Sequence, residues 1–211
     1  VTEAIKLAFA DRDAFYGDPD FTEVPLQHLL SDTYNDERCK LIGDTASMEL
    51  RYGKIDGIAG EVDYAAAIRR GAGEGVPDGG KGAAGAGEPT VGSAGQVTGD
   101  TCHIDVVDKH GNMVSCMPSG GWLQSSPTIP ALGFQLNSRA QMFWLDKNQP
   151  MSLEPGKRPR TTLSPSMVLH EGKPLVAYGT PGGDQQDQWQ TNFFLRHVHF
   201  GMNLQESIDA P

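Results

Sequence analysis

The sequence lacks several features that would assign it to a broad functional class. It has no run of about 18 apolar residues, the length at which a membrane-spanning helix becomes possible. Basic residues are few, because 17 Lys and Arg stand against 27 Asp and Glu and give a formal charge of −10. A surface that follows the phosphates of a nucleic acid needs an excess of positive charge. We therefore expect neither a membrane span nor a nucleic-acid partner.

Cysteine is also scarce. Cys39, Cys102 and Cys116 form an odd set without Cys-x-x-Cys spacing, which indicates neither a zinc site nor a disulfide framework. Cys102 and Cys116 can approach one another if both lie on strands, but we expect buried free thiols, which behave as small apolar side chains. No carboxylate or cysteine falls at ligand spacing from the following histidines: His103, His110, His170, His197 and His199. The sequence therefore predicts no metal ion and no cofactor.

What the chain does contain is a hydroxyl residue at the head of a predicted strand, directly after a glycine-rich segment. Thr101 opens the stretch Thr-Cys-His-Ile-Asp-Val-Val-Asp-Lys-His-Gly-Asn. A threonine Oγ is a poor nucleophile unless a base takes its proton, and the amine of an N-terminal threonine can be that base. An α-amino group titrates near ~7.7–8.0, so part of it is neutral at physiological pH. Cleavage of the Asp100–Thr101 bond would thus place nucleophile and base on one residue, although β-branched residues also suit strands for purely structural reasons.

The first 70 residues are predicted to be mainly helical. Apolar residues recur at helical spacing over residues 2–16, where Thr2 can cap the helix and Gly17 suits the position after its end. Shorter helices are expected further on, over residues 25–30, 33–42 and 62–70. Glycine and alanine dominate residues 71–99, a composition with few side chains to bury and a high ordering entropy. We expect this segment to be a mobile linker.

After residue 101 the apolar pattern changes to the period of strands. Two hairpins are predicted from the following strands: residues 102–107, 113–117, 166–170 and 175–180. A helix is expected over residues 184–199, ended by Gly201, and Asn203 with Glu206 forms a capping-box signal for the next helix. Strands packed between helices predict a layered α/β architecture.

Two other groups of residues suggest chemistry. Gly182 and Gly183 precede the predicted helix, and glycine amides at a helix N-terminus can stabilise the oxyanion of a tetrahedral intermediate. Pro-Gly-Gly is also a common turn sequence. Lys157, Arg158 and Arg160 can supply positive potential for an anionic substrate, or form a solvated basic loop.

Three ordered blocks of this sequence resemble the gamma-glutamyltransferase family, a branch of the N-terminal nucleophile hydrolases. They are Thr-x-His with Val-Val-Asp-x-x-Gly-Asn from residue 101, Lys-Arg-Pro-Arg-Thr-Thr-Leu-Ser-Pro from residue 157, and Gly-Thr-Pro-Gly-Gly from residue 179. The stretch from Glu3 to Pro25 resembles the late part of the family's large subunit.

The resemblance implies an αββα sandwich, of which this chain would hold an internal part. Residues 1–70 would end the large subunit, residues 71–100 would form the linker up to a processing site, and residues 101–211 would form an incomplete small subunit. His103 is interpreted as a structural marker of the family.

The resemblance also implies catalytic roles. Thr101 would be the nucleophile, freed by cleavage after Asp100. Gly182 and Gly183 correspond to the glycines whose amides form the oxyanion hole. Ser119 aligns with a family threonine whose hydroxyl supports the nucleophile, although its Pro-Ser-Gly-Gly context is also that of an ordinary turn.

The substrate pocket both matches the family and departs from it. Thr161 and Thr162 stand where the family has a serine pair that binds the substrate carboxylate, and they can also be plain strand-entry threonines. Glutathione-cleaving members carry an Asn, a Gln and an acidic residue that hold the substrate near its α-amino group, and this sequence has Gly121, Arg139 and Met142 there. Compared with those members, this sequence lacks the carboxylate at these positions and has a cation, Arg139, nearby. Arg139 is therefore a candidate substrate-binding residue.

The sequence therefore predicts an autoprocessed N-terminal threonine enzyme that cleaves gamma-glutamyl-type amides through an acyl-enzyme, with water or an amine as acceptor. One alternative is a glutaryl- or cephalosporin-acylase-like amidohydrolase. Another, of a different class, is a catalytically silent relative or an unprocessed binding fragment. The expected partners are a small-molecule or peptide substrate and the protein's own large and small subunits, alone or in a higher oligomer.

Overall fold

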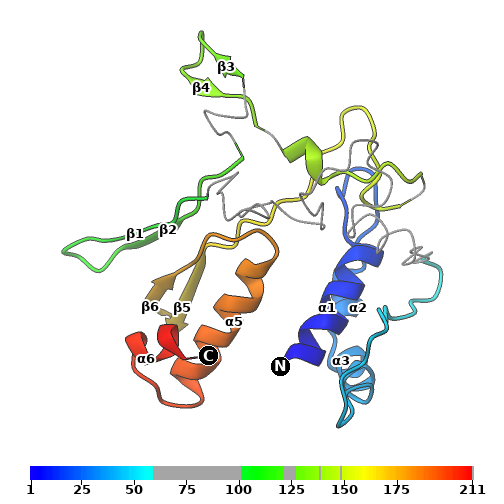
Figure 1. Ribbon diagram of the computed structural model, residues 1–211, viewed down its shortest axis with the longest axis horizontal. Helices are drawn as coiled ribbons and strands as arrows, with labels where there is room; N and C mark the ends of the chain where they lie inside the picture. The colour runs from blue at the N-terminus through cyan, green and yellow to red at the C-terminus, as the bar shows by residue number, and fades with distance from the viewer. Residues whose placement is uncertain (59–100, 121–126, 138, 148, 211) are drawn as a thin grey trace, which may run out of the picture. The chain divides into compact units, whose positions relative to one another are not determined.

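The computed structural model describes residues 1–58, 101–120, 127–137, 139–147 and 149–210 (Figure 1). Contacts divide the chain into two units, Val1–Arg70 with Arg139–Arg160 and Gly71–Ser138 with Thr161–Pro211. Some of the sequence-based predictions concern segments outside the described residues, namely the helix at 62–70, the glycine-rich segment, Asp100 and Gly121.

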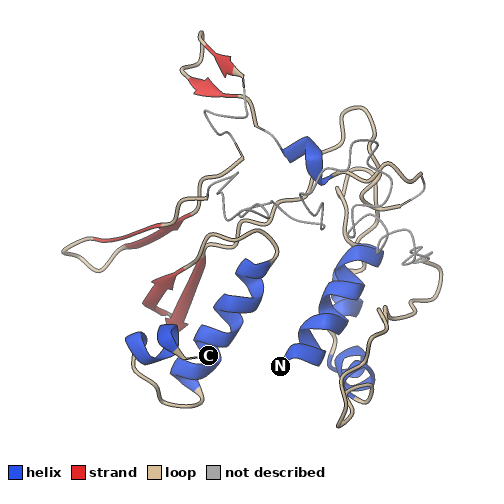
Figure 2. Cartoon of the chain, in the orientation of Figure 1, coloured by secondary structure: helices blue, strands red, loops and turns tan. Residues whose placement is uncertain are grey.

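The first unit contains three of the predicted helices, shown in blue in Figure 2: α1 (Thr2–Phe15), α2 (Leu26–Leu29) and α3 (Asp32–Cys39). Their apolar sides meet in a small core of Ala14, Phe15, Leu29 and Tyr34, against which Trp144 packs. Ser31 caps α3, because its hydroxyl accepts a hydrogen bond from the backbone N–H of Tyr34. The helices predicted over residues 2–16, 25–30 and 33–42 are therefore present, with ends that differ by up to three residues.

The ends of α1 differ from the prediction. Val1 is the N-cap residue and no side chain caps the helix, because Thr2 already lies within it. At the other end Tyr16 is extended, with φ −91° and ψ 133°, so Gly17 does not close the helix in the left-handed conformation. Gly17 is needed for another reason: a Cβ on it would lie 2.6 Å from the carbonyl oxygen of Pro150.

A buried ion pair joins α1 to α3. Arg38 donates from Nε to Asp11 Oδ2 and from Nη2 to Asp11 Oδ1, both at 3.1 Å. Asp11 Oδ1 also accepts from the backbone N–H of Gly53 at 2.7 Å. Paired in this way, both charges can be buried without the cost of an isolated ion.

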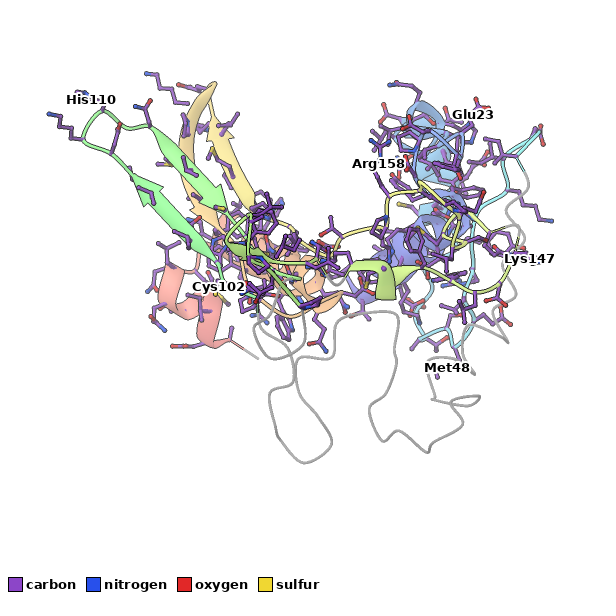
Figure 3. The ribbon with its side chains drawn as sticks, turned by 90° about the horizontal axis from the view of Figure 1, so that it is seen from above. Glu23, Met48, Cys102, His110, Lys147 and Arg158 are labelled. Carbon is purple, nitrogen blue, oxygen red and sulfur yellow. The ribbon has the colours of Figure 1, made fainter. Side chains whose placement is uncertain are left out.

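The second unit opens with an antiparallel hairpin of β1 (Ile104–Val107) and β2 (Met113–Cys116), as predicted. Its turn is organised by Asp108, whose carboxylate accepts from the backbone N–H of His110 at 2.7 Å and of Asn112 at 2.9 Å. A hydrogen bond from the Asn112 side chain, together with these backbone bonds, holds the pKa of Asp108 below its usual range. Figure 3 shows His110 at the tip of this hairpin and Cys102 near its other end.

The second predicted hairpin is also present, as β5 (Ser166–His170) and β6 (Lys173–Tyr178). Glu171 and Gly172 form its turn with φ 50° and 75°, the pair of positive angles that matches strand twist in a two-residue loop. A third hairpin, β3 (Thr128–Ile129) with β4 (Phe134–Gln135), was not predicted, because two-residue strands leave no readable periodicity.

Helix α5 (Gln185–Val198) packs along the β5–β6 hairpin, with the rings of Tyr178 and Phe193 5.2 Å apart (Figure 1). Gly201, at φ 67°, ends this part of the chain. The short α6 (Leu204–Asp209) follows with the predicted capping box between Asn203 and Glu206. The terminator and the capping box are thus confirmed.

Helices together with antiparallel strands give an α/β chain. The thiols are the main error of the sequence-based prediction, because Cys39, Cys102 and Cys116 are free but exposed. Residues on both faces of β1 are exposed, so the alternating pattern there does not mark a core-facing side. Among the residues that the structure describes, no helix combines the length and apolar character needed to cross a bilayer.

Candidate active site

Thr101 and Ser119 lie together in the second unit. The Thr101 side chain is buried, with 4% of the residue exposed, and its Oγ1 is 2.9 Å from the Oγ of Ser119. Either hydroxyl can be the donor. The structure therefore brings the predicted nucleophile and its predicted supporting hydroxyl into direct contact.

The β1–β2 hairpin explains this contact. Thr101 and Ser119 form an antiparallel bridge in the same register as Ile104 and Cys116, three residues further along each strand. The backbone N–H of Cys102 donates to Pro118 O at 3.1 Å, which extends the ladder between the two pairs. The two hydroxyls thus meet because the strand register carries on past the regular hairpin.

His103 lies two residues after Thr101, directly before β1. Its Nε2 lies 2.7 Å from Asp105 Oδ2, because side chains two residues apart lie on the same side of a strand. The search of the sequence for carboxylates near the histidines did not identify this pair. The imidazole packs so closely against Gly179 that a Cβ on this glycine would lie 2.5 Å from Nδ1. The contact places the Thr-x-His segment beside the end of β6. The turn with Gly182 and Gly183, the predicted oxyanion turn, follows directly after this point in the chain.

Gly182 and Gly183 form a buried turn before α5. Their φ angles are 141° and 59°, which favour glycine, and a Cβ on Gly182 would lie 2.5 Å from the ring of Trp189. The carbonyls accept from the backbone N–H groups of Gln185 and Gln186 at 3.1 and 3.2 Å. The turn therefore leads directly into the N-terminus of α5, where positive potential is available to an anion.

Of the predicted carboxylate-binding pair, only Thr162 is buried. Thr161 is exposed, and its hydroxyl accepts from the backbone N–H of Leu163 at 3.1 Å. Within this pair, Thr162 is therefore the better placed to act in an enclosed site.

Gln186 is the residue that the sequence-based prediction missed. It is completely buried, and its amide nitrogen lies 3.0 Å from Thr162 O and 3.2 Å from Thr180 O, with its oxygen 3.3 Å from the N–H of Gly183. The opposite amide orientation would point the side-chain oxygen at two carbonyl oxygens, so we adopt this one. The Gly183 N–H thus donates one long hydrogen bond to the side-chain oxygen of Gln186.

The predicted basic group lies in the first unit. Lys157 Nζ is 3.0 Å from Glu154 Oε1 and lies over the ring of Phe21, and Arg158 donates from Nε to Asp18 at 3.1 Å. Arg158 also keeps the pKa of the Asp18 carboxyl well below its usual range. Both cations are paired with carboxylates. The Arg158 side chain is 63% exposed, as the solvated-loop alternative expects, whereas the Lys157 side chain is 2% exposed.

Arg139 and Met142 are in the first unit as well, on the short 3-10 helix η1 (Arg139–Met142). Each is 5% exposed.

A hollow of about 740 Å³ lies in the second unit between β6, α5 and α6. Its lining includes Thr180, Trp189 and Arg196 but none of the predicted catalytic residues. Within the described ranges, no group of three His, Cys, Asp or Glu side chains is arranged to hold a metal ion.

Comparisons with known proteins identify the family and several relatives of this chain. Residues 1–211 match the sequence model of the family described as Gamma-glutamyltranspeptidase. The Glutathione hydrolase-like YwrD proenzyme of Bacillus subtilis (strain 168) is 34% identical over 212 residues, which are 100% of this chain and 32% of that protein. The chain therefore spans about a third of the length of this curated relative.

Solved structures with a similar fold include the following two. The structure of LmbA2991HD is 46% identical, with a TM-score of 0.72, and the match covers 100% of this chain and 34% of that one. Cephalosporin acylase from Bacillus halodurans is 28% identical, with a TM-score of 0.67, over 99% of this chain and 31% of the acylase.

Proposed function

The chain belongs to the gamma-glutamyltranspeptidase family, and we propose that it is part of an autoprocessed N-terminal threonine enzyme that cleaves gamma-glutamyl-type amides. The contact between Thr101 Oγ1 and Ser119 Oγ, at 2.9 Å, is the observation that carries this proposal. It gives the hydroxyl at the predicted cleavage point a fixed orientation, which a nucleophile needs and an incidental strand threonine does not.

The proposed reaction runs through an ester on Thr101. After cleavage of the Asp100–Thr101 bond, the free amine of Thr101 takes the hydroxyl proton while Oγ1 bonds to the amide carbon of the donor. The C–N bond then breaks and the proton passes to the leaving amine. Water or an acceptor amine attacks the ester, and the threonine hydroxyl is restored.

The remaining site residues fit the same scheme. The amides of Gly182 and Gly183 would receive the oxyanion at the N-terminus of α5, and Thr162, with Thr161 beside it, would bind the carboxylate of the acyl group. In this scheme residues 1–70 belong to a large subunit, residues 71–100 to a linker, and residues 101–211 to a small subunit with the αββα sandwich. The two subunits would remain partners after cleavage.

Processing is the first test of the proposal. In the protein expressed from its full reading frame, we expect intact-mass analysis to find two polypeptides, the smaller beginning Thr101-Cys102-His103. Only this cut creates the amine that acts as base. A single uncut species would instead support a silent relative or a binding unit, and a cut at another bond would move the nucleophile away from Thr101.

A second candidate is an acylase that prefers donors without a free α-amine. The likeness to cephalosporin acylase favours it, as do Arg139 and Met142 at the positions where the resemblance places contacts to the substrate amine. Without a carboxylate and with a cation nearby, a substrate ammonium would be disfavoured by about 1–3 kcal/mol.

This candidate predicts substrate preference in the unmodified enzyme. We expect kcat/KM for glutaryl anilide to exceed that for γ-glutamyl anilide by roughly tenfold, because glutarate lacks the α-amine. The two donors are otherwise alike and can be compared in one spectrophotometric assay. Equal values, or a preference for γ-glutamyl anilide, would return the protein to the glutathione-cleaving group.

A further inference from the structure

The fully buried side-chain amide of Gln186 contacts two parts of the candidate site. These are the Thr162 segment, proposed to bind the carboxylate of the acyl group, and the turn at Gly183, proposed to bind the oxyanion at the other end. Gln186 sits in the first turn of α5, with none of its surface exposed. Its three nearest backbone partners come from the Thr162 segment, from Thr180 at the end of β6, and from Gly183 in the oxyanion turn.

Only an uncharged amide meets the demands of this position. Thr162 O and Thr180 O need donors, at 3.0 and 3.2 Å, and the Gly183 N–H needs an acceptor, at 3.3 Å. A glutamate would present oxygen to two carbonyls, and an apolar side chain would leave all three groups without this partner. Each buried backbone group that loses its partner disfavours the arrangement.

A second glutamine one helical turn later secures the same segment further along. Gln190 donates to Ser164 Oγ at 2.8 Å and accepts from Ser166 Oγ at 2.7 Å, and it is 6% exposed. Gln186 also lies 3.3 Å from Ser164 Oγ, so both glutamines reach this hydroxyl. The contacts of Gln190 are at the entry to β5, and those of Gln186 extend to Thr162, Thr180 and Gly183 in the candidate site.

We propose that Gln186 is a positioning residue that sets the distance between the acyl-carboxylate site at Thr162 and the oxyanion turn at Gly183. This inference rests on the proposed function. A donor with a carboxylate at its far end reacts well only if both ends fit at once, and a misplacement of about 1 Å can cost on the order of 10²-fold in rate. A donor without that carboxylate is indifferent to the distance.

The test compares two acyl anilides, glutaryl with its carboxylate and butyryl without it, in the processed full-length enzyme. We expect Gln186→Met to lower the ratio of kcat/KM for glutaryl over butyryl by roughly tenfold or more. Gln190→Met is the matched control, with the same substitution on the same helix, and its ratio is expected to match the unmodified enzyme. Equal ratios in all three proteins, or the same fall in both variants, would overturn the proposal.

A milder variant covers the case in which Gln186→Met does not fold. Gln186→Asn keeps the amide but shortens the side chain by one methylene, so it cannot span all three segments. Its glutaryl preference is expected to fall while its unfolding temperature stays near that of Gln190→Met, and an unchanged preference would refute the positioning role. If the unmodified protein is uncut at Thr101 or turns over neither anilide, the proposed function itself fails, which is a distinct result.

Discussion

Replacing Thr101 with alanine is expected to abolish both the cleavage of the Asp100–Thr101 bond and the turnover of acyl donors. Both steps use the same hydroxyl, first on the Asp100 carbonyl and then on substrate. Loss of a nucleophile costs on the order of 10⁶ in kcat in a well-studied protease. Intact-mass analysis reports the first effect, and anilide hydrolysis reports the second.

Conservative variants separate the hydroxyl from the rest of the residue. Thr101→Ser keeps Oγ and is expected to retain part of both activities, and Thr101→Cys can still process through its thiol. Ser119→Ala removes the 2.9 Å contact without removing the nucleophile, so a loss of about tenfold is expected, the scale of one hydrogen bond. Normal processing of Thr101→Ala would place the nucleophile elsewhere, with Thr98 the nearest alternative.

The hairpin that brings Thr101 and Ser119 together was predictable because it depends on local rules, whereas Ser119 itself was predicted only from the resemblance to the family. The alternation after residue 101 predicts a hairpin, the Asp-x-x-Gly-Asn turn locates its tip, and a hairpin of fixed register pairs residues equally far from the turn. The capping box at Asn203 and Glu206 was predicted for the same reason, because it needs only four consecutive residues.

Gln186 and the thiols were out of reach because their environments depend on tertiary packing. Trp189, the largest apolar side chain of α5, is 49% exposed, and the helix buries Gln186 and Gln190. Polar residues occupy this face because the segments that it covers expose backbone carbonyls and serine hydroxyls rather than apolar side chains. A hydrophobicity pattern does not record which surface a helix will meet.

A substitution in the oxyanion turn, the segment with Gly182 and Gly183, is expected to have the second large effect on turnover. Gly183→Val is expected to lower turnover by roughly 10²-fold or more, the usual scale for losing an oxyanion donor. At φ 59° a β-branched residue is strained, so the peptide group will rotate and carry its N–H away from the reacting carbonyl. Thr101 and Ser119 are untouched by this change, so processing and substrate turnover report on the turn alone.

Backbone strain by itself is controlled by a glycine at the other end of α5. Gly201 has φ 67°, close to that of Gly183, and a Cβ there meets nothing within 4 Å. Gly201→Val should therefore carry a similar conformational cost, about 1–2 kcal/mol, with turnover near that of the unmodified enzyme. A circular-dichroism spectrum and unfolding temperature matched between the two valine variants would show that the loss in Gly183→Val is catalytic. Near-normal turnover in Gly183→Val would remove Gly183 from the oxyanion hole and leave the N–H of Gly182 as the donor to test next.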